Sequence, residues 1–116
     1  MNVGIDIIEV ERIEKSAKRE AFLKKCFSSA EIELFESKGY CSETIAGRFC
    51  VKEAFSKALG TGVRNFELTD ITTLNDELGA PYLVLQGNAK KALGDRQTCV
   101  SISHTKNYAT AVVIIY

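Results

Sequence analysis

The sequence lacks the features that would place it in a membrane or outside the cell. It has no run approaching the roughly 18 to 20 consecutive apolar residues of a spanning helix. Residues 1–10 lack the basic start and apolar core of a secretory signal. Neither charge sign is in excess, because 15 basic residues balance 15 acidic ones. We therefore predict a cytoplasmic protein with no membrane partner. We also expect no nucleic-acid partner, although the balanced charge by itself argues neither for nor against one.

Several catalytic and metal-binding classes are also excluded or disfavoured. The chain has one histidine, which excludes a zinc site built from several histidines. Its four cysteines show no C-x-x-C spacing, which disfavours structural zinc and indicates free thiols in a reducing compartment. There is no G-x-S-x-G segment to support a Ser-His-Asp hydrolase.

No repeat, low-complexity tract or linker interrupts the chain. With 116 residues, of which 46% are hydrophobic, it is long enough for one core but not for two. We predict a single domain over residues 1–116, of the mixed α/β (α+β) class, with a small antiparallel sheet packed against a long central helix.

The periodicity predicts the elements of this domain. Alternating or continuous apolar residues predict strands, and apolar residues at helical spacing predict helices. Residues 28–39 form the best-marked helix, since Ser28 and Glu31 make an S-x-x-E capping box and Gly39 marks the stop. The predicted strands are 3–10, 71–74, 82–85, 99–103 and 108–115; the other predicted helices are 12–25 (one short helix or a pair), 46–62 and 88–93, and 63–68 is a loop or short strand.

The central helix, residues 46–62, carries charges where a buried helix should have none. Its apolar residues cover both sides, which is typical of a buried helix. Glu53 and Lys57 interrupt one apolar stripe, so they must pair with each other or hold a ligand. Arg48 and Lys52 are like charges four residues apart, and an anion between them would relieve their repulsion. Gly60 ends the helix, either as ordinary C-terminal punctuation or as a place where a backbone amide could meet a phosphate.

A second isolated carboxylate, Asp6, stands in the first predicted strand. A structural salt bridge would explain it, as would a bound metal. Asp6 and Glu53 together suit Mg²⁺, which takes one or two protein carboxylates plus substrate phosphates. With basic side chains on the same helix, the residues alone predict a magnesium-dependent enzyme acting on a phosphorylated or nucleotide-like substrate.

Two further segments have both an ordinary and a functional interpretation. Residues 12–25 contain six basic and two acidic side chains, which suits a solvated face or a docking surface for an acidic partner. Residues 101–105, Ser-Ile-Ser-His-Thr, lead into a predicted hairpin tip. His104 there is either an ordinary surface residue or a contact for a phosphate or a base edge.

These motifs resemble those of the small holo-[acyl-carrier-protein] synthases, the bacterial phosphopantetheinyl transferases of fatty-acid synthesis. The similarity is carried by Gly-Ile-Asp at residues 4–6 and by Phe-Cys-Val-Lys-Glu-Ala-Phe-Ser-Lys at 49–57. Ala-Gly-Arg at 46–48, Ala-Leu-Gly-Thr-Gly at 58–62 and the segment 101–105 extend it. The resemblance runs almost from end to end, and the long central motif is specific.

The resemblance implies transfer of 4'-phosphopantetheine from coenzyme A to a serine of apo acyl carrier protein, releasing adenosine 3',5'-bisphosphate. Asp6 and Glu53 would hold Mg²⁺ against the pyrophosphate, and Lys57 would neutralise charge on the leaving group. Cofactor contacts would come from the nucleotide or phosphate binders, namely Arg48, Lys52, Lys57, Gly60, His104 and Thr105. Glu53 and a metal-bound water are both candidates for deprotonating the serine.

The resemblance also implies an assembly and a partner. The small class is homotrimeric with active sites at subunit interfaces, and Arg12 and Arg19 would receive the acidic carrier protein. Larger relatives carry an acidic metal ligand two residues after the Asp, but that position is Ile8 here, which fits the small class. Two alternatives are a non-enzymatic trimeric adaptor that binds acidic helical proteins and a magnesium-dependent nucleotide hydrolase.

Overall fold

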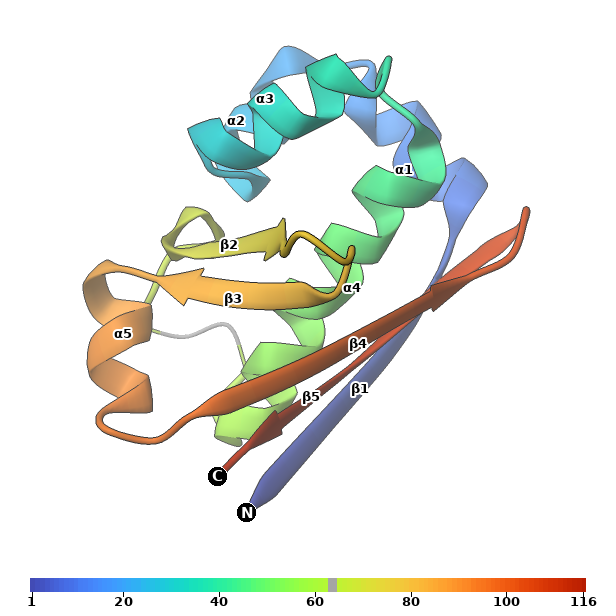
Figure 1. The fold of residues 1–116 in the computed structure, drawn as a ribbon. Coiled ribbons are helices and arrows are strands. Elements are labelled where there is room, and N and C mark those ends of the chain that lie inside the picture. Colours follow the sequence, from blue (N-terminus) through green and yellow to red (C-terminus); the bar gives the residue numbers. More distant parts are fainter. Residues whose placement is uncertain (63–64) are drawn as a thin grey trace.

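The computed structural model describes residues 1–62 and 65–116, which form two antiparallel sheets around a long helix (Figure 1). The first sheet has the order β1-β5-β4, from β1 (Asn2–Glu9), β5 (Tyr108–Ile115) and β4 (Thr98–His104). The second pairs β2 (Ile71–Asn75) with β3 (Pro81–Leu85). The predicted fold class is confirmed, and so are the five predicted strands, to within a residue or so at their ends.

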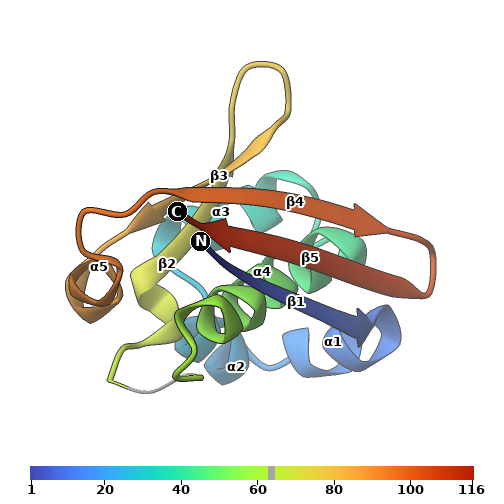
Figure 2. The same ribbon diagram turned by 90° about the horizontal axis from the view of Figure 1, so that it is seen from below.

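The central helix, α4 (Ser42–Leu59), lies along one face of the first sheet (Figure 2). It is buried on most sides, as its two apolar stripes predicted. It ends at Gly60, whose φ of 81° is the left-handed conformation that glycine adopts most easily. The helix starts earlier than predicted. Its N-cap, Cys41, makes no side-chain capping bond, so the usual signal for a helix start is missing.

Three helices cover the other end of α4. Of the two alternatives predicted for residues 12–25, one short helix or a pair, the structure has the pair, α1 (Val10–Ala17) and α2 (Glu20–Cys26). Next comes α3 (Ser29–Ser37), where Ser28 and Glu31 form the predicted capping box. A 3₁₀ turn, η1 (Leu68–Asp70), precedes β2, while residues 63 and 64 of the predicted loop lie outside the described residues.

The remaining helix, α5 (Gly87–Leu93), connects β3 to β4. It begins one residue before the predicted start and is preceded by Gln86, which makes no side-chain capping bond. Nowhere in residues 1–62 and 65–116 is there a helix long and apolar enough to cross a membrane.

Gly4 allows β1 to lie unusually close to α4. A Cβ atom at this position would sit 1.9 Å from the carbonyl oxygen of Ala54 and 2.6 Å from the amide nitrogen of Ala58. Only glycine fits such a backbone approach. The close contact brings Asp6, on the same face of β1 two residues later, against the helix that carries Glu53.

Candidate active site

One stripe of α4 stays open while the rest of the helix is buried. Phe49, Glu53 and Lys57 are four residues apart and therefore lie one above another. Phe49 and Glu53 are partly exposed, and the Lys57 side chain is 56% exposed. The charged residues that interrupt the apolar stripe in the sequence, Glu53 and Lys57, thus lie on the accessible side of α4.

Asp6 approaches this stripe from β1. Lys57 Nζ lies 3.3 Å from Asp6 Oδ1 and donates a second hydrogen bond to the Ile5 carbonyl, at 2.9 Å. Asp6 and Glu53 line one pocket of about 330 Å³, whose wall also includes Arg12, Phe22 and Phe49. The structure therefore brings together the three residues predicted to be catalytic.

The pKa values of two groups near Asp6, the Glu53 carboxyl and the Cys50 thiol, are raised. Burial, and after it the negative charge of Asp6, raises the pKa of Glu53, while Lys57 opposes this shift. Burial and the same Asp6 charge raise the pKa of the Cys50 thiol to about 12, so this buried cysteine stays protonated. Two carboxylates compete for one lysine here, an arrangement that a divalent cation would relieve.

The donor set fits a hard cation rather than a zinc or copper site. No group of three or more His, Cys, Asp or Glu side chains able to hold a metal occurs among the residues that the structure describes. Asp6 and Glu53 supply the one or two carboxylates with which proteins usually bind Mg²⁺, leaving other positions for water and phosphate oxygens. Magnesium is therefore the metal that these residues could hold.

Lys52 does not belong to this site, so its predicted role as a cofactor contact is wrong. Its side chain is 0% exposed and pairs with Glu31 Oε1 at 2.7 Å. Its ammonium also donates to the carbonyls of Leu68 and Ile71, which occupies all three protons. One residue along a helix is a turn of about 100°, enough to point Lys52 away from Glu53. Sequence reasoning missed Glu31, whose capping box was assigned no role beyond starting α3.

Arg48 lies on the buried side of α4 with Lys52. The residue is 7% exposed, and its guanidinium donates to Asn75 Oδ1 at the end of β2. Burial lowers the pKa of the Arg48 guanidinium, and the nearby charge of Glu31 opposes this. The predicted anion between Arg48 and Lys52 is not needed, because Arg48 donates to Asn75 and Lys52 pairs with Glu31.

The remaining predicted cofactor contacts lie outside the pocket. His104 is exposed at the end of β4, opposite Ala109 of β5, which in turn faces Ile8 of β1. Two strand spacings, about 10 Å, therefore separate it from the strand of Asp6. Thr105 accepts hydrogen bonds from the amides of Asn107 and Tyr108 through its hydroxyl. The Gly60 amide already donates to the Lys57 carbonyl, at 3.0 Å.

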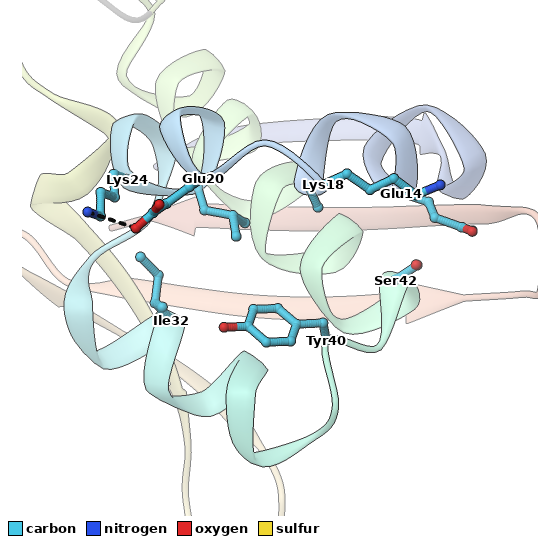
Figure 3. A pocket seen from close by; sticks show the side chains of 9 residues that line it. Glu14, Lys18, Glu20, Lys24, Ile32, Tyr40 and Ser42 are labelled. Carbon is cyan, nitrogen blue, oxygen red and sulfur yellow. Dashed lines mark ion pairs between the residues drawn. The ribbon is translucent and has the colours of Figure 1, made fainter.

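A roomier pocket of about 570 Å³ lies between α1, α2 and α3 (Figure 3). The Tyr40 side chain lies beside Ile32 along this pocket, opposite charged side chains from α1 and α2. Those charges alternate in sign, and Glu20 already pairs with Lys24 at 2.9 Å. None of the predicted site residues lines this roomier pocket.

Comparison with known proteins agrees with the site. Residues 2–113 match the family model of the 4'-phosphopantetheinyl transferase superfamily. A holo-[acyl-carrier-protein] synthase of Fusobacterium nucleatum is 48% identical, over 99% of this chain and 98% of that protein. Another, from Alkaliphilus oremlandii, is 48% identical over 97% of this chain and 95% of that protein.

Solved structures give the same result. The crystal structure of Helicobacter pylori holo-[acyl-carrier-protein] synthase in complex with coenzyme A is 37% identical, with a TM-score of 0.86 and 98% and 99% of the two chains covered. The enzyme from Neisseria meningitidis has a TM-score of 0.88 at 30% identity, with 99% and 97% covered. The carboxylates on β1 and α4, the fold and these similarities lead to one conclusion: the chain belongs to the 4'-phosphopantetheinyl transferase superfamily, among its holo-[acyl-carrier-protein] synthases.

Proposed function

We propose that Asp6 and Glu53 hold Mg²⁺ while this protein transfers 4'-phosphopantetheine from coenzyme A to a serine of apo acyl carrier protein. The products are the holo carrier protein, for fatty-acid synthesis, and adenosine 3',5'-bisphosphate. One observation carries this proposal. Two carboxylates from β1 and α4 line one pocket, and the half-exposed Lys57 pairs with one of them, Asp6.

The bound cation would supply charge neutralisation for the pyrophosphate, which is the main requirement of phosphoryl transfer. Burial, and after it the charge of Asp6, raises the pKa of Glu53, and a cation beside both carboxylates would offset the repulsion that contributes to this shift. Lys57 can turn toward an anion, since its side chain is 56% exposed and its contact with Asp6 is long, at 3.3 Å. Its ammonium would then stabilise negative charge on the departing nucleotide phosphate.

The aromatic side of the pocket would limit water around the reacting phosphorus. Phe22 and Phe49 stack with ring centroids 6.1 Å apart, and both line the pocket that holds Asp6 and Glu53. Arg12 lines the same pocket from α1. The serine of a carrier protein docked on α1 would therefore enter beside the two carboxylates.

The carrier-protein surface would consist of the cations of α1 and α2 that no acidic neighbour neutralises. Lys15 pairs with Glu11 at 3.4 Å, and Lys24 pairs with Glu20 at 2.9 Å, so these lysines contribute less. Arg12 and Arg19 are exposed and make no ion pair within the described part of the chain. They remain the proposed contacts for an acidic partner.

A homotrimer would complete the site. The face of the first sheet that points away from α4 exposes Val3, Ile5 and Ile7 by 64%, 62% and 67%. The strand register continues this face across Val112 and Ile114 of β5. Such an apolar sheet face supports burial against other copies of the chain. His104, Thr105 and Arg48 would then contact the nucleotide bound at a neighbouring subunit.

The cytoplasm remains the proposed location of this reaction. All four cysteines are free, and two of them, Cys26 and Cys50, are buried in the core. Free thiols are typical of a reducing compartment.

The test is incubation of the protein with coenzyme A and apo acyl carrier protein, with and without Mg²⁺. We expect the carrier to gain the mass of phosphopantetheine only with Mg²⁺. Absence of a mass gain, with a carrier that a reference enzyme modifies, would disprove the proposal. Loss of coenzyme A without an acceptor would instead indicate a hydrolase. A folded Glu53→Gln variant that keeps full function would favour an adaptor.

A further inference from the structure

A buried ion pair lies outside the site. Glu31 of α3 and Lys52 of α4 are both 0% exposed, and their charged atoms are 2.7 Å apart. Burying two charges is costly, and such a pair is tolerated only where its remaining hydrogen bonds are also satisfied. Burial lowers the pKa of Lys52, and Glu31 opposes that shift.

Each partner of this pair is bonded to the segment that leads into the second sheet. Lys52 donates to the Leu68 carbonyl of η1, at 2.9 Å, and to the Ile71 carbonyl at the start of β2. Glu31 accepts from the amide of Thr73 in β2, at 3.2 Å, through its other oxygen. Two charged side chains thus fix the position of β2 relative to α3 and α4.

The far end of β2 is held to α4 by Arg48. This arginine lies one turn before Lys52 and donates to Asn75 Oδ1. Asn75 is itself oriented by the bond from its Nδ2 to the Gly79 carbonyl in the β2–β3 turn, at 2.9 Å. Arg48 Nε and Thr73 Oγ1 are buried without a partner. The Asn75 side chain therefore orients the Arg48 guanidinium. Because Asn75 is the last residue of β2, its position depends on the position of that strand.

We propose that Glu31 is a positioning residue for the transfer reaction: through Lys52 it fixes β2 against α4, and through β2 it directs Arg48. This inference rests on the proposed function, in which Arg48 contacts the nucleotide of coenzyme A. Asp6, Glu53 and Lys57 lie on β1 and on the open stripe of α4, so a shift of β2 leaves them in place. Loss of the pair therefore weakens coenzyme A binding more than it slows turnover at saturation.

The experiment compares Glu31→Gln, Lys52→Met and the double variant with the parent protein. Each single change leaves a buried group without its partner and should lower the melting temperature. The double variant removes both charges with side chains of similar length, so part of the melting temperature should return, although the Leu68 and Ile71 carbonyls lose the ammonium as a donor. Glu33→Gln, at an exposed glutamate of the same helix, is the matched control.

Coenzyme A affinity measured by calorimetry separates positioning from stability. For the double variant we expect Kd to rise about tenfold, the loss of one charge-assisted hydrogen bond, with kcat at saturating coenzyme A within about twofold. A folded double variant with the Kd of the parent would overturn the inference and leave the pair only structural.

Asn75→Ala tests the exposed end of the same connection: it leaves the Glu31–Lys52 pair intact and removes the acceptor of the Arg48 guanidinium. It should also raise Kd for coenzyme A, and an unchanged Kd would overturn the inference even if the buried variants do not fold. A parent protein that binds no coenzyme A would refute the proposed function together with this inference. A parent that binds and transfers, alongside an Asn75→Ala variant that binds equally well, would refute this inference alone.

Discussion

At the scale of single residues, the site depends on the absence of a side chain at Gly4. The backbone of β1 lies so close to α4 that even a methyl group at Gly4 would overlap the carbonyl of Ala54. Without that approach, Asp6 would stand farther from the helix that carries Glu53 and Lys57. The glycine and the aspartate of the Gly-Ile-Asp segment therefore have linked roles.

Gly4→Ala should destabilise the protein and reduce transfer activity together. We expect a loss of at least about 1 to 3 kcal/mol, the usual cost of overpacking, because the obstacle is backbone and cannot move aside. Urea unfolding followed by fluorescence or circular dichroism measures it. Asn2→Ala, at an exposed position of the same strand, is the control and should change stability little. Equal stability of Gly4→Ala and the parent would refute the close contact.

Glu53→Gln should change the pH dependence of stability as well as abolish turnover. The folded-state pKa of Glu53 is raised above the ordinary value of 4.5, so the folded protein keeps this proton while the unfolded chain loses it. Stability is therefore lost as pH rises through that interval and stays lower above it. Without Mg²⁺, the variant should melt like the parent below pH 4.5 and above the parent near neutral pH.

Added Mg²⁺ gives the second half of this test. Binding to the folded parent should raise its melting temperature near neutral pH and narrow the gap to Glu53→Gln. A variant that responds to Mg²⁺ as strongly as the parent would argue against Glu53 as a ligand.

The sequence predicts which residues share a face of α4, because that depends on helical periodicity. It does not predict which of them contact side chains from other elements. Asp6, Glu53 and Lys57 were predictable because a charge in an apolar context needs a partner. Lys52 satisfies the same rule, yet its partner, Glu31, comes from another helix 21 positions away. The helical repeat shows that Lys52 and Glu53 point in different directions, but only tertiary packing decides which of them meets solvent.

At the scale of elements, α1 and α2 differ from a uniformly basic surface. Lys15 and Lys24 pair with glutamates one turn away, which leaves unpaired positive charge, within the described residues, on the two arginines and on Lys18 and Lys25. The sequence predicted helical structure and the net positive charge of this segment from local spacing and composition, but it left open whether there is one helix or two. Which cations remain unpaired depends on side-chain geometry.

Arg19→Glu should slow association with acidic carrier protein about tenfold at low salt, and the effect should fade as salt rises. Lys15→Glu makes the same change in net charge at a residue already paired with Glu11, so it should slow association less. Stopped-flow mixing over a series of salt concentrations measures both. Equal effects of the two variants would mean that net charge alone, rather than Arg19, guides the carrier.

At the scale of the whole molecule, one face of the first sheet is not covered by any of the residues that the structure describes. α4 packs on the inner face of the β1-β5-β4 sheet, and the outer face shows valine and isoleucine to solvent. The alternation of Val3, Ile5 and Ile7 was visible in the sequence. It does not reveal that this row points outward, because an apolar row is the usual sign of the core side.

Ile5→Lys should convert the proposed trimer into single chains and remove most of its transfer activity. A lysine on this face would be buried without a partner in the assembly, which is strongly unfavourable. Analytical ultracentrifugation measures the mass in solution. Val84→Lys, at a 47% exposed valine in β3 of the second sheet, should leave both assembly and activity near the parent level. A parent that sediments as a single chain would refute the trimer.

One cysteine on the same outer face can show whether other copies of the chain cover that face. Cys99 is exposed and lies opposite Ile114 in the sheet register, while Cys26 and Cys50 are buried and burial raises the pKa of both thiols. Alkylating reagents attack thiolates at accessible positions, so Cys99 is the thiol whose rate of labelling depends on whether other copies shield β4. Mass spectrometry distinguishes Cys99 from the partly exposed Cys41, so alkylation at Cys99 over a dilution series would follow assembly and disassembly.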